Sequence, residues 1–275
     1  MKITVKVPGS CGELVQGFYR GEPVLITCPI EKFSSVTISD EFKGIENLGE
    51  KSRTMLEKVL NFFGEKFFCA GVRLTSELPE GKGMSSSSAD LAAVAKAVAL
   101  FLDKKISAAE IGKIAAEIEP TDGVFFEGVV AMNPLKGNLL KKIVLPEKYF
   151  VAVFDYGGKI DTVKFNRRSN FQISDLNTEI NFELIKKSAL ENQKILPKRG
   201  IEEIIEFSQK LGAITVNVAH SGTVIGIFFS ENDTNINFKI RELQKSFHFV
   251  KYICLTKICD GGFYISRECG KNLSQ

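Results

Sequence analysis

The sequence predicts an α+β fold in two domains, and three observations support this. The chain has 275 residues, of which 44% are hydrophobic and 25% charged, as in an ordinary globular protein. A strand-like run at 67–76 leads through a glycine- and serine-rich segment into a helical run at 84–102. The second half follows a β-α-β-β-α-β order with an extra helix, which is typical of a ferredoxin-like domain. The change of pattern around Pro146 predicts a first domain over 1–147 and a second over 148–275.

The first half begins with alternating apolar and polar residues at 2–8, which predict a strand. The glycine-punctuated stretch at 8–17 predicts a turn. Ser107 and Glu110 form a capping box, which opens a helix that reaches about residue 118. The other expected elements are strands at 23–30, 33–39 and 67–76, helices at 51–63 and 84–102, and strands at 124–132 and 138–145.

The second half begins with a strand-like run at 149–155, and the polar segment 157–175 predicts an irregular loop. Gly212 ends one helix, and Asp-Gly-Gly at 260–262 predicts a turn between the last two strands. The expected elements after the loop are helices at 179–195 and 201–211, strands at 213–219 and 223–229, a helix at 236–247, and strands at 249–256 and 262–267.

Composition excludes several classes of protein. A net charge of +3 without a dense Lys/Arg stripe does not suit a nucleic-acid binder. No apolar run reaches the ~18 residues of a membrane span. The N-terminus lacks a signal-peptide core, so we expect a cytoplasmic protein with reduced thiols. The six cysteines form no C-x-x-C pair and only two histidines are present, which argues against a structural zinc site.

The most informative segment is L-P-E-G-K-G-M-S-S-S-S-A at 78–89. Glycines let the backbone come close to an anion, and the N–H groups at a helix N-terminus then face it. A serine-capped surface helix is the plainer alternative, but one serine is enough for a cap. The segment therefore predicts a phosphate-binding loop, made of Pro79, Glu80, Gly81, Lys82, Gly83, Met84, Ser85, Ser86, Ser87 and Ser88.

This segment resembles the P-x-x-x-G-L-G-S-S-A-A signature of the GHMP kinase superfamily, in which nucleotide phosphates wrap around the loop. Met84 stands for the leucine, and Ser85 stands for the third glycine. The resemblance implies a ribosomal-S5-like first domain, a ferredoxin-like second domain and an active site between them. It also implies ATP and Mg²⁺ as cofactors, with Ser87 near the metal.

Two further motifs extend the resemblance. V-P-G-S-C-G-E-L-V-Q-G-F near the N-terminus is similar to the first motif of homoserine kinases, whose turn contacts an amino-acid substrate. A-H-S-G-T-V-I-G-I-F at 219–228 is similar to the family's third motif, which lines the transfer site. The substrate residues that these motifs imply are Ser10, Cys11, Gly12, Glu13, Gln16, His220, Ser221, Gly222 and Thr223. Glu13 would pair with the substrate's ammonium group or bond the turn's own amides.

A carboxylate follows in E-P-T-D-G at 119–123. The sequence around Asp122 resembles the D-V-P-F-F stretch of an isoprenoid-pathway member of the superfamily, where the aspartate is a catalytic base or orienter. A carboxylate close to a hydroxyl can accept its proton during phosphoryl transfer. The alternative is an Asx turn before Gly123. Glu117, Glu119 and Glu127 offer oxygen ligands for Mg²⁺, and Glu119 is the first choice because it is expected to lie closest to the loop.

Together the motifs resemble the L-threonine kinase branch of the superfamily, which supplies threonine phosphate for the cobalamin side chain. The resemblance implies phosphoryl transfer from ATP to the hydroxyl of a small amino acid. The competing hypotheses are a kinase for homoserine or another small alcohol, a superfamily decarboxylase, and a non-catalytic nucleotide sensor. The decarboxylase would need basic residues near the first motif, where Gly9 and Ser10 supply none. The sequence leaves the oligomeric state open, a homodimer included.

Overall fold

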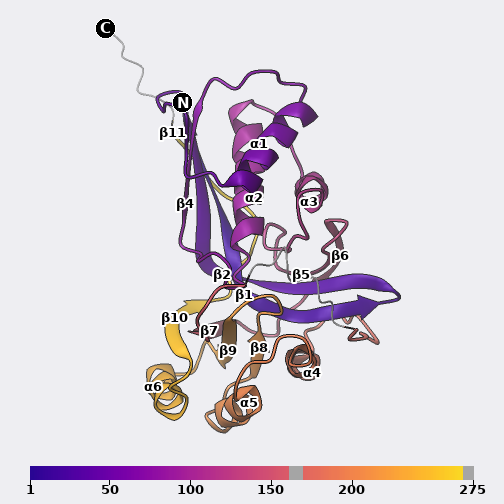
Figure 1. Cartoon of the computed structure of the whole chain (residues 1–275), viewed down its shortest axis with the longest axis vertical. Helices are drawn as coiled ribbons and strands as arrows, with labels where there is room; N and C mark the ends of the chain where they lie inside the picture. The colour runs from indigo at the N-terminus through magenta and orange to yellow at the C-terminus, as the bar shows by residue number, and fades with distance from the viewer. Residues whose placement is uncertain (161–169, 269–275) are drawn as a thin grey trace.

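The computed structural model describes residues 1–160 and 170–268, and these form a mixed α+β structure around one sheet. The sheet of the described residues has eleven strands, with the order β10-β7-β9-β8-β1-β2-β4-β3 along its main path. β11 pairs with β1, β5 pairs with β2, and β6 pairs with β5. Figure 1 shows α1, α2 and α3 beside one end of this sheet and α4, α5 and α6 at the other. The predicted α+β fold class is confirmed.

The first half is built around two long antiparallel strands, β1 and β2, that extend as a hairpin in Figure 1. β1 (Lys2–Tyr19) runs through the segment where a turn was predicted, so the prediction of a turn at 8–17 is wrong. Register shifts at Pro8/Gly9, Ser10/Glu13 and Glu13/Val15 show that the glycines serve bulges inside a strand. The other elements of this half are β2 (Glu22–Ser39), β3 (Ile45–Glu46), α1 (Glu50–Phe62), β4 (Gly71–Ser76), α2 (Ser86–Phe101), α3 (Ala108–Ala116), β5 (Val129–Asn133) and β6 (Asn138–Ile143).

The second half has the predicted ferredoxin-like arrangement. Its strands lie in the order β10-β7-β9-β8 with antiparallel neighbours, and its helices follow the expected sequence with α5 as the extra one. These elements are β7 (Tyr149–Asp155), α4 (Phe182–Asn192), α5 (Ile201–Lys210), β8 (Thr215–Val218), β9 (Val224–Ser230), α6 (Ile236–Ser246) and β10 (Lys251–Lys257). Of the loop predicted at 157–175, residues 161–169 lie outside the described residues.

The last strand does not stay with the second half. β11 (Tyr264–Glu268) pairs antiparallel with β1, from Lys2 opposite Glu268 to Lys6 opposite Tyr264. The chain therefore crosses back to the sheet of the first half after β10. A division at 147/148 remains a prediction, and it would separate β11 from its partner strand.

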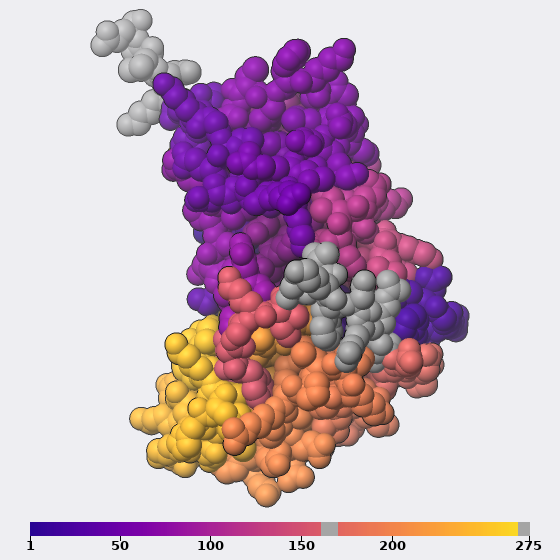
Figure 2. Space-filling view, viewed as in Figure 1, coloured from indigo at the N-terminus to yellow at the C-terminus, as the bar shows by residue number. Residues whose placement is uncertain are grey.

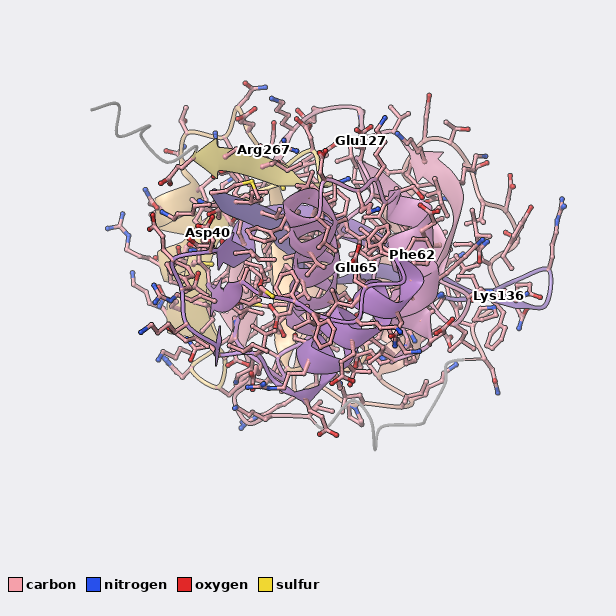
Figure 3. The ribbon with its side chains drawn as sticks, turned by 90° about the horizontal axis from the view of Figure 1, so that it is seen from above. Asp40, Phe62, Glu65, Glu127, Lys136 and Arg267 are labelled. Carbon is pink, nitrogen blue, oxygen red and sulfur yellow. The ribbon has the colours of Figure 1, made fainter. Side chains whose placement is uncertain are left out.

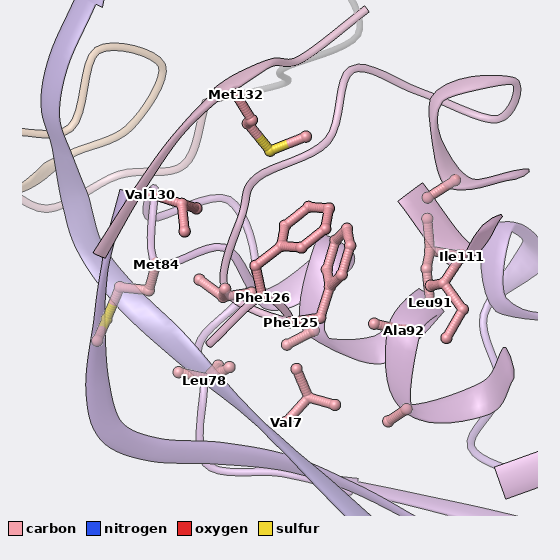
Figure 4. Packing of buried hydrophobic residues seen from close by; sticks show 14 of the residues in the cluster. Val7, Leu78, Met84, Leu91, Ala92, Ile111, Phe125, Phe126, Val130 and Met132 are labelled. Atoms are coloured by element: carbon pink, nitrogen blue, oxygen red, sulfur yellow. The ribbon is translucent and has the colours of Figure 1, made fainter. Parts of the chain in front are cut away.

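Two clusters of buried apolar side chains form the core. The larger one packs α1, α2 and α3 on the first part of the sheet, and the smaller one fills the space beneath α4, α5 and α6. Figure 4 shows Met84 and Leu78 in the larger cluster, near the adjacent rings of Phe125 and Phe126, whose centroids lie 4.8 Å apart. The loop before α2 is thus anchored in the core by Leu78 and Met84. Among the described residues, no helix is long and apolar enough to cross a membrane.

Candidate active site

A cavity of about 900 Å³ is lined by residues of both halves. Figure 2 shows the two halves as the indigo-to-magenta and orange-to-yellow parts of one surface. The predicted site residues that line the cavity are Glu13, Gln16, Glu80, Gly81, Gly83, Met84, Ser85, Ser86, Ser87, Ser88, Glu119, Asp122, His220 and Ser221. The predicted residues that lie outside its lining are Ser10, Cys11, Gly12, Pro79, Lys82, Gly222 and Thr223.

The N-terminus of α2 opens into this cavity. Its N-cap residue, Ser85, makes no side-chain cap hydrogen bond within the described part of the chain, so the helix is not a serine-capped one. Unpaired N–H groups at a helix N-terminus, together with the helix dipole, make a favourable place for an anion. The local geometry is thus compatible with the predicted phosphate loop.

Three of the four consecutive serines bond to residues predicted to carry the chemistry. The Oγ of Ser87 contacts the carboxylate of Glu119. The Oγ of Ser88 accepts from the backbone N–H of Asp122 at 2.9 Å and from the hydroxyl of Thr121 at 3.2 Å. The hydroxyl of Ser85 contacts that of Ser10 and hydrogen bonds to Asp122. The serine run therefore fastens the E-P-T-D segment to the start of α2.

Ser85 adopts a conformation that explains the family's preference at this position. Its φ of 55° and ψ of 27° lie in the left-handed region, which glycine enters without steric cost. A serine here is strained by roughly 1–2 kcal/mol. Its hydroxyl, which glycine lacks, makes the contacts with Ser10 and Asp122. The departure from the family signature thus adds a hydrogen bond to the candidate base.

The glycines of two motifs pack against each other. A Cβ on Gly83 would lie 2.4 Å from the Cβ of Ala219, and one on Gly222 would lie 2.2 Å from the carbonyl oxygen of Lys82. That carbonyl oxygen accepts from the N–H groups of Thr223 at 2.9 Å and Val224 at 3.2 Å. The absence of a side chain at Gly83 therefore serves a close contact between the second and third motifs.

Lys82 is committed to an ion pair away from the cavity. Its Nζ lies 2.6 Å from Oδ2 of Asp155, whose other oxygen accepts from the hydroxyl of Thr223 at 2.6 Å. Burial raises the pKa of Asp155, but the hydrogen bonds from Lys82, Thr223 and the N–H of Gly157 outweigh it and hold that pKa below its ordinary value. Lys82 and Thr223 thus join the second motif to the third.

Glu13 and His220 contact each other in the lining of the cavity. Oε2 of Glu13 accepts from the backbone N–H of His220 at 2.7 Å and lies 3.4 Å from its Nδ1. The ring of His220 also contacts the carbonyl oxygen of Val218 through Nδ1 at 3.1 Å and the hydroxyl of Ser188 through Nε2 at 2.9 Å. His220 is only 3% exposed, and both of its ring nitrogens have protein partners. These contacts give the ring a structural role.

Asp122 lies in an environment that suits a proton acceptor. Burial, followed by the negative charge of Glu13, raises the pKa of Asp122 to about 7, and Glu119 adds to this while Ser85 and Ser88 oppose it. A carboxylate whose pKa lies near neutrality is both available and basic enough to take a proton. The raised pKa of Asp122 is therefore compatible with the predicted role as a base.

The carboxylate of Glu119 is held from two sides. One oxygen contacts the hydroxyl of Ser87, and the other contacts the ammonium of Lys51 from the first turn of α1. Mg²⁺ commonly binds through one or two protein oxygens together with substrate phosphates and water, so Ser87 and Glu119 fit its needs. No group of three or more His, Cys, Asp or Glu side chains placed for a metal occurs within residues 1–160 and 170–268.

The other two glutamates considered for the metal lie apart. Glu117 pairs with Lys58, and its side chain is 63% exposed. Glu127 pairs weakly with Lys142 and is 84% exposed, at the periphery of the molecule in Figure 3. Neither lines the cavity, so Glu119 is the one of these three glutamates that does.

Three residues near the site had no signal in the sequence. Lys51 and Asn192 line the cavity, and the Nζ of Lys198 lies 2.8 Å from the carbonyl oxygen of Ala219. Burial lowers the pKa of Lys198 to about 8, and the charge of Glu13 opposes this. No recognisable motif contains any of them, so only the folded chain shows that they belong to the site.

The fold is that of the GHMP kinases. Residues 53–127 match the family model of the GHMP kinases N terminal domain. The chain is 26% identical over 281 residues to the L-threonine kinase of Salmonella typhimurium, covering 92% of this chain and 93% of that protein. The predicted resemblance to the superfamily is confirmed, and these comparisons support the predicted enzyme class, a phosphotransferase acting on a hydroxyl group.

Solved structures confirm the fold. The structure of a putative homoserine kinase from Listeria monocytogenes matches with a TM-score of 0.66 at 17% identity, over 97% of this chain and 100% of that one. A mevalonate pyrophosphate decarboxylase from Streptococcus pyogenes matches with a TM-score of 0.65 at 14% identity, over 94% and 97% of the two chains. The fold alone therefore does not separate kinases from decarboxylases.

Proposed function

We propose that this protein transfers the γ-phosphate of ATP to the hydroxyl group of L-threonine, giving O-phospho-L-threonine for cobalamin synthesis. The substrate and pathway are suggested by the likeness to the Salmonella typhimurium L-threonine kinase over nearly the full length of both chains. The observation that carries the reaction type is the cavity in which the start of α2, the Ser87–Glu119 contact and Asp122 meet. A cytoplasmic location and a homodimer remain predictions.

In the proposed reaction, the amides at the start of α2 bind the phosphates, and Ser87 with Glu119 holds Mg²⁺. The metal would neutralise charge on the transferred phosphoryl group. Asp122 would orient the substrate hydroxyl and accept its proton, a role that its raised pKa favours. Glu13, a buried carboxylate of the cavity lining, would face the substrate's ammonium group. Positioning and charge neutralisation would supply most of the rate.

The test is ADP release by the purified protein with Mg²⁺ and ATP, across L-threonine, L-homoserine, L-serine and threonine lacking its amino group. We expect the highest kcat/KM for L-threonine, with the product identified by phosphorus NMR. A preference for L-homoserine would replace the substrate and keep the kinase.

A sensor and a decarboxylase would each give a distinct result in the same experiment. Nucleotide binding without turnover of any hydroxyl compound would point to a sensor. Release of carbon dioxide from a diphosphorylated hydroxy acid would point to a decarboxylase. Among the described residues, the cavity lining contains one lysine and no arginine.

A further inference from the structure

Lys51 occupies an unusual place in the cavity. It is the second residue of α1, and its ammonium contacts the Oε2 atom of Glu119. The Lys51 side chain is 38% exposed, whereas that of Glu119 is only 11% exposed. Because the other oxygen of Glu119 contacts Ser87, one carboxylate separates Lys51 from the start of α2.

The charge around Lys51 is strongly one-sided. The carboxylates that line the cavity are Glu13, Glu50, Glu80, Asp90, Glu119 and Asp122. Among the described residues of that lining, Lys51 is the sole lysine or arginine. Lys82, the basic residue of the phosphate loop itself, is held by Asp155 outside the lining. Among the described residues of the lining, a polyphosphate would therefore meet one cationic side chain, and that side chain is paired with Glu119.

The pair between Lys51 and Glu119 is suited to exchange. Partly exposed ion pairs contribute little to stability, because solvent screens them and long side chains lose freedom on pairing. The ammonium of lysine sits on a flexible four-carbon stem and can move between partners. A metal bound to Glu119 would take over the positive charge that Lys51 supplies there.

We propose that Lys51 pairs with Glu119 in the metal-free protein and moves its ammonium group onto a phosphate oxygen of the nucleotide once Glu119 binds Mg²⁺. Lys51 thus holds Glu119 against Ser87 before the nucleotide arrives, and it binds the nucleotide afterwards. This inference rests on the proposed function. It gives a nucleotide-binding role to Lys51, a residue of α1 that none of the three motifs contains.

The test is the affinity for a non-hydrolysable ATP analogue, measured by calorimetry in Mg²⁺ and in EDTA. Lys51→Met removes the charge and keeps most of the side-chain length. The matched control is Lys58→Met on the same helix, where Lys58 pairs with Glu117 at 2.7 Å outside the cavity. Thermal unfolding and circular dichroism check that each variant is folded, and Lys51→Arg tests whether a positive charge restores binding.

If Lys51 exchanges partners, the loss of affinity for the ATP analogue in Lys51→Met should depend on the metal. In Mg²⁺ the dissociation constant of Lys51→Met should rise roughly tenfold, as expected for a lost charged hydrogen bond. In EDTA it should change less than about twofold, because Lys51 is then engaged with Glu119 in a weak, partly exposed pair. Lys58→Met should bind like the native protein in both conditions.

Glu119→Gln supplies an independent arm. Without the carboxylate, Lys51 is released, so the analogue should bind more tightly than to the native protein in EDTA. The double variant Lys51→Met/Glu119→Gln should lose this gain, which makes the coupling measurable as a double-mutant cycle.

Two results would overturn the inference while leaving the kinase in place. Equal losses in Mg²⁺ and EDTA would make Lys51 a fixed phosphate-binding residue, and native affinity in Mg²⁺ would reduce it to a surface ion pair. If the native protein fails to bind the analogue with Mg²⁺ at all, the proposed function falls together with the inference.

Discussion

Asp122 gives the sharpest quantitative prediction, because its environment places its pKa near neutral pH. Burial and the charge of Glu13 raise its pKa to about 7. A base must be ionised to accept a proton, so activity should be lost as pH falls through this value. About half of the molecules would carry the ionised base at pH 7 and about a tenth at pH 6, so kcat/KM should fall nearly tenfold between pH 6 and pH 5. An ordinary aspartate, with a pKa of about 3.9, would leave the rate flat over this range.

The assay is the initial rate of ADP release with saturating ATP and Mg²⁺, over pH 5 to 8.5 at constant ionic strength. Glu13→Gln should shift the acidic limb to lower pH, because it removes a charge that raises the pKa of Asp122. Its side-chain oxygen can still accept from the N–H of His220, so the local fold is kept. Glu127→Gln, which alters an exposed carboxylate outside the cavity, should leave the limb unchanged.

Asp122→Asn tests the role of the carboxylate directly. Loss of a general base lowers kcat by roughly 10²–10⁴-fold while nucleotide binding persists. A rate within about threefold of the native protein, or a profile that is flat down to pH 5, would rule out Asp122 as the base. Asp122 would then be a turn residue, and the base would have to be sought among the other carboxylates of the cavity.

The remaining predictions concern packing, the metal and acid stability. Gly83→Ala should destabilise the protein by about 1–3 kcal/mol more than Gly21→Ala in denaturant unfolding. Both glycines have positive φ, but only a Cβ at Gly83 would meet a neighbour, the Cβ of Ala219 at 2.4 Å. Equal losses of stability would show that Ala219 simply moves aside. Ser87→Ala should raise the Mg²⁺ concentration needed for half-maximal rate and leave the unfolding temperature nearly unchanged, and an unaltered Mg²⁺ dependence would remove Ser87 from the metal site. Because hydrogen bonds hold the pKa of Asp155 below its ordinary value, the stability it contributes is present above about pH 4 and is lost as pH falls further. Asp155→Asn should therefore flatten the acid limb of unfolding free energy against pH, and a parallel curve would contradict this.

Local chemistry predicted much of the fold because several signals act within a few residues. The capping box of Ser107 and Glu110 is present at the start of α3, with both reciprocal hydrogen bonds formed. The order of strands and helices in the second half could be predicted because the spacing of apolar residues changes between that of a strand and that of a helix. Clear breaks separate these runs. These signals need no knowledge of distant residues.

The first motif shows where such reasoning fails. Its glycines have the pattern of a turn, yet the segment stays in β1, because pairing with β2 and β8 outweighs local preference. The N–H groups of Ser10 and Gly12 also donate to the carbonyl oxygens of Met84 and Gly83, at 3.0 and 2.9 Å. Those bonds connect segments more than seventy residues apart, so no local pattern announces them.

The candidate site divides in the same way. The phosphate loop and Asp122 could be predicted because they lie inside compact motifs. Lys51 and Asn192 were missed, because each is an ordinary residue on a helix that only folding brings to the cavity. Lys82 shows the opposite case. Its motif predicts contact with phosphate, but in the folded chain its ammonium group forms an ion pair with Asp155.

The pairing of β11 with β1 has a consequence for how the chain is made. Residues 264–268 cover part of one edge of β1, and they leave the ribosome after all the other described strands. Until then that edge presents free backbone groups that can pair with another chain. The hydrogen bonds of Val5 and its neighbours in β1 are therefore complete only after β11 has been made. A nascent or truncated chain lacking β11 would be the species most prone to aggregate. A chaperone acting on this protein would have to shield that edge.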